Sequence, residues 1–408
     1  MLHLTGVDDG RLLLDLPWSV PLEEWPVEQL VALPRGISRH VVRFVRVEGR
    51  VYAVKEVGQH AAQREYRLLR DLEKLDVPSV EAVGIVDGRT SPTGEPLETA
   101  LITRHLQFSL PYRALFSQTL RPDTAVRLLD ALSVLLARLH SEGFYWGDCS
   151  LSNTLFRRDA GAFAAYLVDA ETGELHGTLS EGQRRYDLEI AHGNIIGELL
   201  DLQAGGLLDE NVDPIATGDD VIARYSCLWS ELTESEVIGL DERHRIAARV
   251  RRLNSLGFDV EELTISTEGG SSTVRIQPKV VDAGHHSRRL LRLTGLDVEE
   301  NQARRLLNDL DAYRTAALAD RDDEVAAHEW LANVFQPVVL AVPKELRGKL
   351  EQAEVFHEVL EHRWFLSEVA GRDVGLPAAV SSYVKEILPT KPDERAVLGS
   401  RLGPASTT

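Results

Sequence analysis

Two aspartates and an asparagine give this sequence its strongest chemical signal. Asp148 and Asn153 stand five positions apart, and Asp169 follows the short apolar run 164–168. Phosphoryl transfer needs an acid that orients the attacking hydroxyl, and oxygen ligands that hold magnesium against the nucleotide phosphates. The spacing predicts that Asp148 accepts or orients the proton of that hydroxyl, and that Asn153 and Asp169 bind the metal.

A candidate phosphate-binding lysine, Lys55, lies upstream of these acids. Lys55 ends an alternating segment typical of a strand, where a kinase places the lysine that contacts the α- and β-phosphates. A glutamate on the next helix holds such a lysine, and Glu65 lies in the helix predicted over residues 60–75. Glu56 and Glu73 are less well placed partners. A strand-end lysine is usually a solvated surface charge. The phosphate-binding role of Lys55 is therefore inferred from the residues around it, above all from Glu65.

A loop that covers phosphates belongs between the first two predicted strands. The segment there runs from Gly36 through Ser38 and Arg39 to His40, with a single glycine. Several glycines normally let the backbone approach phosphates closely, so the pattern is weak. We expect Gly36, Ser38 and Arg39 to contact the nucleotide, with an ordinary turn as the alternative.

The residues after Asp169 depart from the Asp-Phe-Gly of most protein kinases. Ala170 and Glu171 follow instead, which argues against an activation-loop switch of the protein-kinase type. Glu171 has two open interpretations, a second metal ligand and a salt-bridge residue. Asp187 also has two, a structural acid that hydrogen-bonds the catalytic loop and the N-cap of a helix.

The periodicity around these residues predicts the elements that must position them. Alternation and helical spacing succeed one another in the order strand, helix, strands and long helix. The expected elements are a hairpin over 41–57, a helix over 60–75, strands over 80–86 and 97–103, and helices over 123–140 and 185–202. This order predicts an α+β fold with a small β-rich N-lobe and a helical C-lobe.

Composition limits the classes of protein that remain. The chain has 408 residues and a net charge of −19, which disfavours nonspecific binding to nucleic acid. Cys149 and Cys227 are the only cysteines, so a disulfide framework is not expected. We see no signal peptide and no run of about 18 apolar residues, and we expect no membrane span and a cytoplasmic location.

The second half of the chain is mostly helical in pattern. One hairpin is expected over 261–278, and two short helices over 290–313 with a break near Gly295. The aromatic residues farther on are most simply core: Trp330, Phe335, Phe356, Trp364 and Phe365. We divide the chain into an N-lobe with an extension (1–106), a C-lobe with the catalytic loop (107–205), a helical C-terminal domain (206–390) and a flexible tail (391–408).

A basic cluster stands out in this acidic chain. Such a group could bind an anionic ligand, and the plainer interpretation is a solvated helix face paired with nearby acids. Its members are Arg275, Lys279, His285, His286, Arg288, Arg289 and Arg292.

Residues 34–202 resemble the protein-kinase-like superfamily, most closely the compact bacterial lipopolysaccharide (Kdo/WaaP-type) and aminoglycoside-phosphotransferase-like kinases. The resemblance rests on Ala53-Val54-Lys55, on Gly147-Asp148 through Asn153, and on Leu167-Val168-Asp169. The whole chain is similar to an actinobacterial family that adds a C-terminal domain of unknown function. The resemblance implies a bilobal kinase fold and a site for ATP and Mg²⁺. It does not name the acceptor, and lipopolysaccharide is not expected in organisms that lack it.

We therefore expect a kinase that transfers the γ-phosphate of ATP to a hydroxyl, with a small-molecule acceptor slightly favoured over a protein. A pseudokinase-like regulatory or scaffold protein that binds nucleotide is the first alternative. Transfer of AMP by the same fold is the second. The sequence does not determine the acceptor, the oligomeric state, any regulation or the task of the C-terminal domain.

Overall fold

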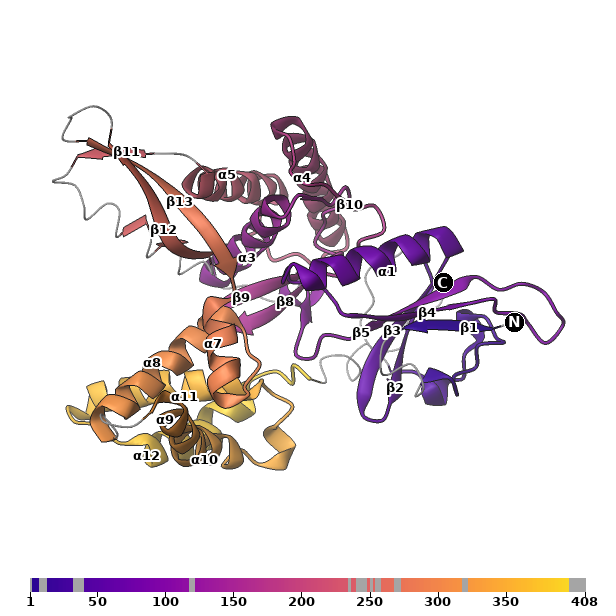
Figure 1. The fold of residues 1–408 in the computed structure, drawn as a ribbon. Coiled ribbons are helices and arrows are strands. Elements are labelled where there is room, and N and C mark those ends of the chain that lie inside the picture. The colour runs from indigo at the N-terminus through magenta and orange to yellow at the C-terminus, as the bar shows by residue number, and fades with distance from the viewer. Residues whose placement is uncertain are drawn as a thin grey trace. The chain divides into compact units, whose positions relative to one another are not determined.

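The computed structural model describes most of the chain (Figure 1). The described residues fall into two compact units, each of which is treated by itself. One is formed within Met1–Phe156 and Ala165–Ala223, and the other within Arg157–Ala164 and Arg224–Ala396. The described ranges are 2–6, 13–31, 40–116, 122–233, 236–239, 248–249, 252–253, 258–267, 273–317 and 322–395.

The first unit begins with a five-stranded antiparallel sheet in the order β1-β4-β5-β3-β2. Its strands are β1 (His3–Gly6), β2 (Val42–Val47), β3 (Arg50–Val57), β4 (Ala82–Asp87) and β5 (Thr99–Arg104). The predicted hairpin over 41–57 is confirmed as β2 and β3. Its turn residues Glu48 and Gly49 have φ values of 47° and 82°, as a two-residue hairpin turn requires.

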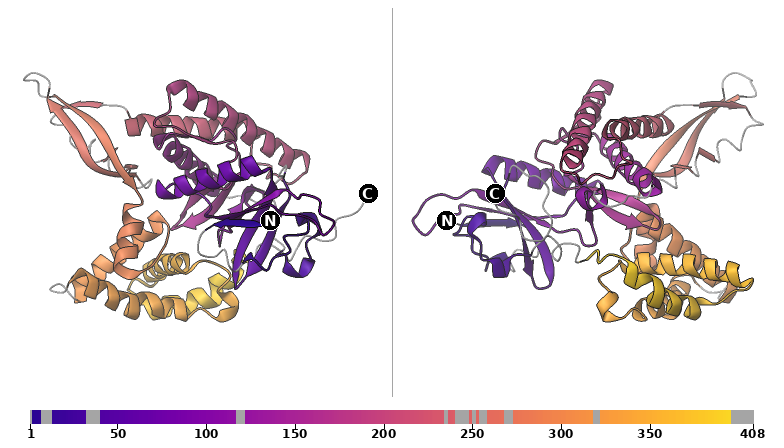
Figure 2. Two further views of the ribbon diagram at one scale, coloured as in Figure 1. Left: turned by 45° about the vertical axis from the view of Figure 1, so that its right-hand side comes forward. Right: turned by 180° about the vertical axis from the view of Figure 1, so that it is seen from behind.

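The alternation of β3 divides its side chains between two hydrophobic clusters. Tyr52 and Val54 face the N-terminal extension, in a cluster that includes the buried Trp18 and Trp25. The opposite face, where Leu101 is buried, packs on α1 (Gln59–Lys74) (Figures 1 and 2). Because successive strand residues point to opposite faces, Lys55 is directed away from the extension and toward α1.

The helical part of this unit supports two small sheets and confirms the helices predicted over 123–140 and 185–202. The helices are α2 (Tyr112–Phe116), α3 (Pro122–Ser141), α4 (Glu181–Ala204) and the first half of α5 (Pro214–Thr233). The strands are β6 (Leu110–Pro111), β7 (Phe144–Tyr145), β8 (Thr154–Asp159), β9 (Ala162–Leu167) and β10 (Glu174–Leu175), arranged as β6-β8-β9 and β10-β7. The ends of β8 and β9 at their shared turn, within Arg157–Ala164, belong to the second unit. Ser180 and Gln183 form a capping box that starts α4.

The second unit contains a three-stranded sheet in the order β11-β13-β12, followed by helices. The expected hairpin over 261–278 and the helix break at Gly295 are both confirmed. The elements are β11 (Glu236–Gly239), β12 (Phe258–Thr267), β13 (Thr273–Ala283), α7 (His285–Thr294), α8 (Glu300–Ala317), α9 (Asp323–Trp330), α10 (Gln336–Leu340), α11 (Gln352–Ala370) and α12 (Leu376–Ser382).

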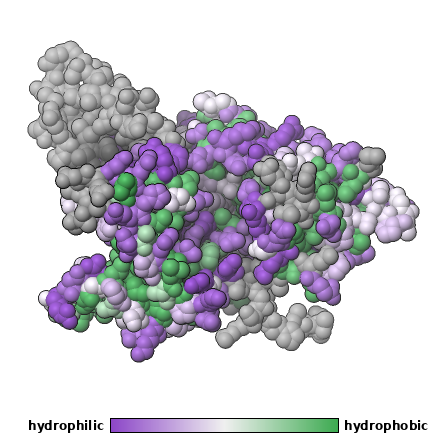
Figure 3. All heavy atoms as spheres, turned by 60° about the horizontal axis from the view of Figure 1, so that its bottom comes forward, coloured by the Kyte–Doolittle hydropathy of each residue, from purple (hydrophilic) through white to green (hydrophobic). Residues whose placement is uncertain are grey.

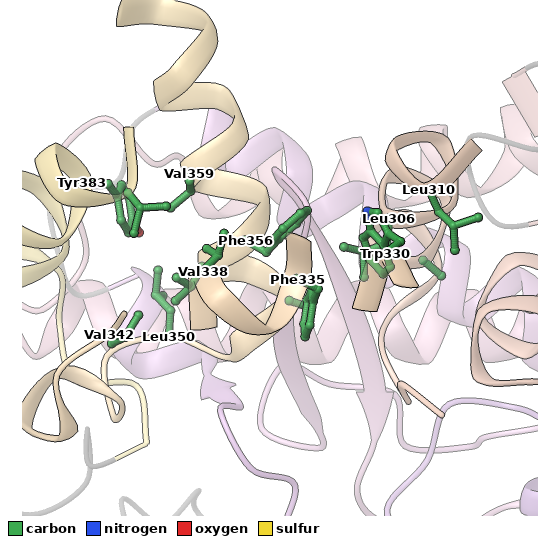
Figure 4. Close-up of a cluster of buried hydrophobic side chains, with 14 of the residues drawn as sticks. Leu306, Leu310, Trp330, Phe335, Val338, Val342, Leu350, Phe356, Val359 and Tyr383 are labelled. Carbon is green, nitrogen blue, oxygen red and sulfur yellow. The ribbon is translucent and has the colours of Figure 1, made fainter. Parts of the chain in front are cut away.

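The helical core of the second unit is built around three aromatic rings (Figure 4). The centroids of Trp330, Phe335 and Phe356 lie 5.2 to 5.8 Å apart. The expectation that Trp364 and Phe365 are core is wrong, because these side chains are 67% and 55% exposed on α11. Apolar residues elsewhere also reach the surface, as Figure 3 shows for the face it displays.

Among the described helices, none has both the length and the apolar character needed to cross a bilayer.

Arg89 ties the N-terminal extension to the sheet. Its side chain is fully buried and pairs with Glu56 at 2.7 Å. The same guanidinium donates to the carbonyl oxygens of Trp18 at 3.0 Å and Val20 at 2.7 Å. The buried charge is therefore matched by one carboxylate and by backbone acceptors of the extension.

We predict that Arg89→Leu lowers the free energy of unfolding by about 3 kcal/mol, because it removes the cation that pairs with Glu56 and the donor to three carbonyl groups, including that of Glu98. Urea unfolding measures this change. The exposed pair of Lys74 and Asp71 supplies the control, since Lys74→Ala should cost less than about 0.5 kcal/mol. Equal losses in the two variants would refute the anchoring role of Arg89.

Candidate functional site

Lys55 lies at the centre of a cluster of carboxylates. Its Nζ is 3.0 Å from Glu65 Oε2, 2.8 Å from Asp169 Oδ2 and 3.2 Å from Glu171 Oε2. The Lys55 and Glu65 side chains are only 11% and 2% exposed. The ion pair predicted between Lys55 and Glu65 is thus present, and Asp169 joins it from 114 positions farther along the chain.

The charges of this cluster shift one another's protonation. Burial opposes the charged form of Lys55, but the carboxylates of Glu65 and Asp169 outweigh it and raise the pKa of the ammonium group. Burial and the Asp169 charge raise the pKa of Glu65 to about 8, against the opposing effect of Lys55. One ammonium thus faces more negative charge than it can neutralise.

Three carboxylates of this cluster are close enough to share a cation. Ligand oxygens of Glu65, Asp169 and Glu171 all lie within 4.8 Å of one another. Carboxylate oxygens are the ligands that Mg²⁺ prefers, so the donor set fits a magnesium ion. Glu171 also pairs with His40 at 2.9 Å, which realises the salt-bridge interpretation of this residue.

Hydrogen bonds from two asparagines hold the carboxylate of Asp148. Asn153 Nδ2 donates to Asp148 Oδ2 at 3.2 Å and to the Asp148 carbonyl at 3.0 Å. Asn194 Nδ2 donates to Asp148 Oδ1 at 3.1 Å. Gly147 precedes this acid with a φ of 73°, and a Cβ there would lie 2.9 Å from the Tyr145 ring, so the bend needs glycine.

Asp187 proves to be the structural acid, and Ser180 is the N-cap of α4 instead. The Asp187 side chain is fully buried. It accepts hydrogen bonds from the backbone N–H groups of Trp146 and Gly147, both at 2.8 Å. His140 Nε2 lies 3.1 Å from the same carboxylate. Asp187 therefore fixes the start of the catalytic loop.

Asn194 and Glu198 on α4 were missed by the sequence reasoning. Besides contacting Asp148, Asn194 donates to the Cys149 carbonyl at 3.2 Å. Glu198 accepts from the backbone N–H groups of Leu151 at 2.7 Å and Ser152 at 3.2 Å. The one available signal was their spacing of four residues on a predicted helix, which many exposed polar pairs share.

The Asp169 segment is bonded directly to the catalytic loop. Trp146 Nε1 donates to the Asp169 carbonyl at 2.9 Å, and Thr172 Oγ1 donates to the Trp146 carbonyl at 2.9 Å. The backbone N–H of Val168 donates to the Asn153 carbonyl at 3.0 Å. The two predicted metal ligands are therefore held on adjoining backbone segments.

Lys55, Glu65 and Asp169 line a cavity of about 780 Å³ in the first unit, together with Asp148 and its two asparagine partners. One part of its lining is apolar: Val42, Ala53, Leu101, Leu106, Leu155 and Val168. The other part is charged or polar: Lys55, Glu65, Asp148, Asn153, Asp169, Arg113, Asn194, Glu198 and Asp201. A cavity lined by apolar residues together with convergent polar and charged groups is the usual form of a small-molecule site.

The other predicted binding residues are not among the residues that line this cavity, or they lie outside the described residues. Gly36, Ser38 and Arg39 lie outside the described residues. In the basic cluster, His286 lies 2.6 Å from Glu300 and Arg289 lies 3.9 Å from Asp311, as expected for a helix face paired with acids. His285, Arg288 and Arg292 share helix α7 with them, and the side chains of Arg275 and Lys279 are not described.

Comparison with known proteins agrees with this arrangement. The model of the lipopolysaccharide kinase (Kdo/WaaP) family matches residues 44–193, which include Lys55, Asp148 and Asp169. The model of a domain of unknown function, DUF4032, matches residues 227–388. The expected protein-kinase-like fold and the additional C-terminal domain are thereby confirmed, and the match supports a kinase-like phosphotransferase.

A solved structure titled "WaaP in complex with acyl carrier protein" is also similar. It is 19% identical in sequence, covers 62% of this chain and 99% of its own, and aligns with a TM-score of 0.38. Among proteins with curated descriptions, none matches this sequence significantly.

His105, which lines the cavity, is expected to make the stability of the fold depend on pH. Its ring packs edge-on against Phe44 with centroids 5.6 Å apart, and burial lowers the pKa of His105 to about 4. In the unfolded chain the same group takes up its proton near pH 6.5. The unfolded state therefore binds more protons between pH 6.5 and 4, and stability falls as the pH is lowered through that window.

We predict that this group costs roughly 2 kcal/mol of stability at pH 4.5 relative to pH 7, and that His105→Gln removes that part of the pH dependence. Urea unfolding at the two pH values gives the difference. His60→Gln, at an exposed position of α1, should keep the wild-type dependence. An unchanged pH dependence in His105→Gln would contradict the assignment.

Proposed function

We propose that this protein is an ATP- and Mg²⁺-dependent phosphotransferase that phosphorylates a hydroxyl group of its acceptor. The observation that carries the proposal is the convergence of Lys55, Glu65 and Asp169 in the cavity that Asp148 also lines. These residues come from a strand, a helix and two loops far apart in the sequence. Such a convergence matches the parts that phosphoryl transfer uses for positioning and charge neutralisation.

In this proposal Lys55 binds the α- and β-phosphates, and Glu65 keeps its ammonium group directed into the cavity. Asn153 and Asp169, with Glu171 as a further carboxylate, would hold the metal. When bound, magnesium supplies positive charge against the triphosphate oxygens. The excess negative charge around Lys55 supports cation binding at this place.

Asp148 would orient the acceptor hydroxyl and receive its proton. The acceptor oxygen forms a bond to the γ-phosphorus, the bond from that phosphorus to the β–γ bridging oxygen breaks, and ADP leaves. Asn153 and Asn194 hold the two carboxylate oxygens of Asp148, so the acid needs little reorientation before the reaction. We propose a small-molecule acceptor ahead of a protein, because the sequence after Asp169 lacks the protein-kinase activation motif.

We predict that Asp169→Ala and Asp148→Asn separate binding from chemistry. Asp169→Ala should weaken the binding of ATP in the presence of Mg²⁺, because it removes a metal ligand. Asp148→Asn should retain that binding and lose at least about 100-fold in turnover. Calorimetry measures the binding, and ADP release with a cell metabolite extract as acceptor pool measures turnover. Asp219→Asn, an exposed acid that pairs with His192 on the same unit, is the control and should behave as wild type.

The outcome also decides between the proposed function and its alternatives. The mass of the labelled product shows a gain of one phosphoryl group if the proposal holds, and a gain of AMP if the fold transfers nucleotide instead. Nucleotide binding without turnover in any extract would favour a regulatory pseudokinase. Full turnover by Asp148→Asn would remove this aspartate from the catalytic role.

A further inference from the structure

The β8–β9 hairpin joins two of the proposed metal ligands. Asn153 immediately precedes β8, and Asp169 follows the end of β9 by two residues. Its turn residues Ala160 and Gly161 have φ values of 50° and 84°, which gives a tight two-residue connection. At the open end, the hydrogen bond from Val168 to Asn153 closes the hairpin.

The open end of the hairpin is anchored in the first unit. Leu167 accepts from the backbone N–H of Val80 at 2.9 Å, and its own N–H donates to Pro78 at 3.0 Å. In the middle, Phe156 is fully buried and stands opposite Leu110 in the pairing of β8 with β6. The strands therefore behave as a short rigid element with fixed points at this end.

The tip of the hairpin belongs to the second compact unit, where Asp159 binds the first turn of α8. Its Oδ1 accepts from the Gln302 N–H at 2.7 Å, and its Oδ2 accepts from the N–H and the side-chain amide of Asn301 at 3.2 and 2.9 Å. First-turn N–H groups have no partner within their own helix. A carboxylate from 142 positions upstream thus does the work of a helix cap.

The neighbouring tip residues each have a partner in the same unit. Arg157 lies 2.9 Å from Glu299 and 2.7 Å from Glu351. Arg158 pairs with Glu394 at 2.6 Å, and the Ala160 N–H donates to Glu354 at 3.0 Å. Four consecutive residues of the hairpin are thus bonded to α8, α11 and the segment after α12.

Release of the tip would take hydrogen-bond or ion-pair partners away from several buried carboxylates. Asp159, Glu354 and Glu394 are each 3% exposed or less. A buried charge that loses its partner costs several times more than an exposed ion pair contributes. The second unit therefore holds the tip firmly. In return, Arg157 and Arg158 of the tip pair with glutamates of that unit.

We propose that the C-terminal unit acts on phosphoryl transfer through this hairpin, with Asp159 as the positioning residue that fixes the spacing of Asn153 and Asp169. The inference rests on the proposed function. It assigns to the domain of unknown function the role of holding the proposed metal ligands at a fixed spacing. Because β8 and β9 run without a break from the tip to Asn153 and Asp169, strain at the tip is transmitted along both strands to the backbone that carries the proposed metal ligands.

The test compares Asp159→Asn with Asp373→Asn in the full chain. Asp373 is an exposed control acid of the second unit: like Asp159 it accepts a backbone N–H, here from Gly375, but its ion-pair partner is Arg363, outside the hairpin. The Mg²⁺ concentration for half-maximal binding of ATP, measured by calorimetry, should rise at least fivefold in Asp159→Asn. In Asp373→Asn it should stay within twofold of wild type, whatever the loss of stability in either variant.

A second variant avoids changing the hairpin at all. Asn301→Ala removes one donor to Asp159 and keeps the backbone N–H, so the fold is retained. It should raise the Mg²⁺ requirement about twofold and speed amide hydrogen exchange along β8 and β9. A folded Asp159→Asn variant with faster exchange at the tip and an unchanged Mg²⁺ requirement would overturn this inference alone. A wild-type chain that binds no ATP with Mg²⁺ would overturn the proposed function and this inference together.

Discussion

The placement of one buried ammonium among three carboxylates is the constraint on which the kinase-like unit depends. Lys55 can be buried only because Glu65 and Asp169 compensate its charge, and these acids can approach one another only because the lysine lies between them. Strand β3 places Lys55, helix α1 places Glu65, and the end of β9 places Asp169 in this contact. The same cluster holds three carboxylates around one ammonium group, which supports the proposed cation site.

Helix α4 provides the second level of order. Asp187, Asn194 and Glu198 are spaced by seven and four residues, so they lie on one face of the helix, two turns and one turn apart. Their side chains satisfy backbone groups of the catalytic loop that would otherwise be buried without partners. A loop with little regular structure is thus held in one conformation by a rigid neighbour, which is how a site on a loop becomes precise.

Local patterns in the sequence predicted the elements and the chemistry. They could not predict contacts between residues far apart in the chain. The alternation around Lys55 and the spacing of Asp148 and Asn153 depend on residues close in the chain, so they could be read directly. Asp187 left two interpretations open, because its partners lie 40 residues away. Trp364 and Phe365 were assigned to the core wrongly, since large apolar side chains on a helix are often exposed.

The interleaving of the two units sets an order of events during synthesis. Residues of the cavity, from Glu23 to Asp201, leave the ribosome well before the last partner of the hairpin tip, because Glu394 follows Arg158 by 236 positions. Domains generally fold in the order in which they are made. The kinase-like unit is therefore expected to fold first. Its β8–β9 hairpin gains its last tip contact, with Glu394, only when synthesis is nearly finished. A nascent or shortened chain carries the residues of the cavity with an unsecured hairpin between them.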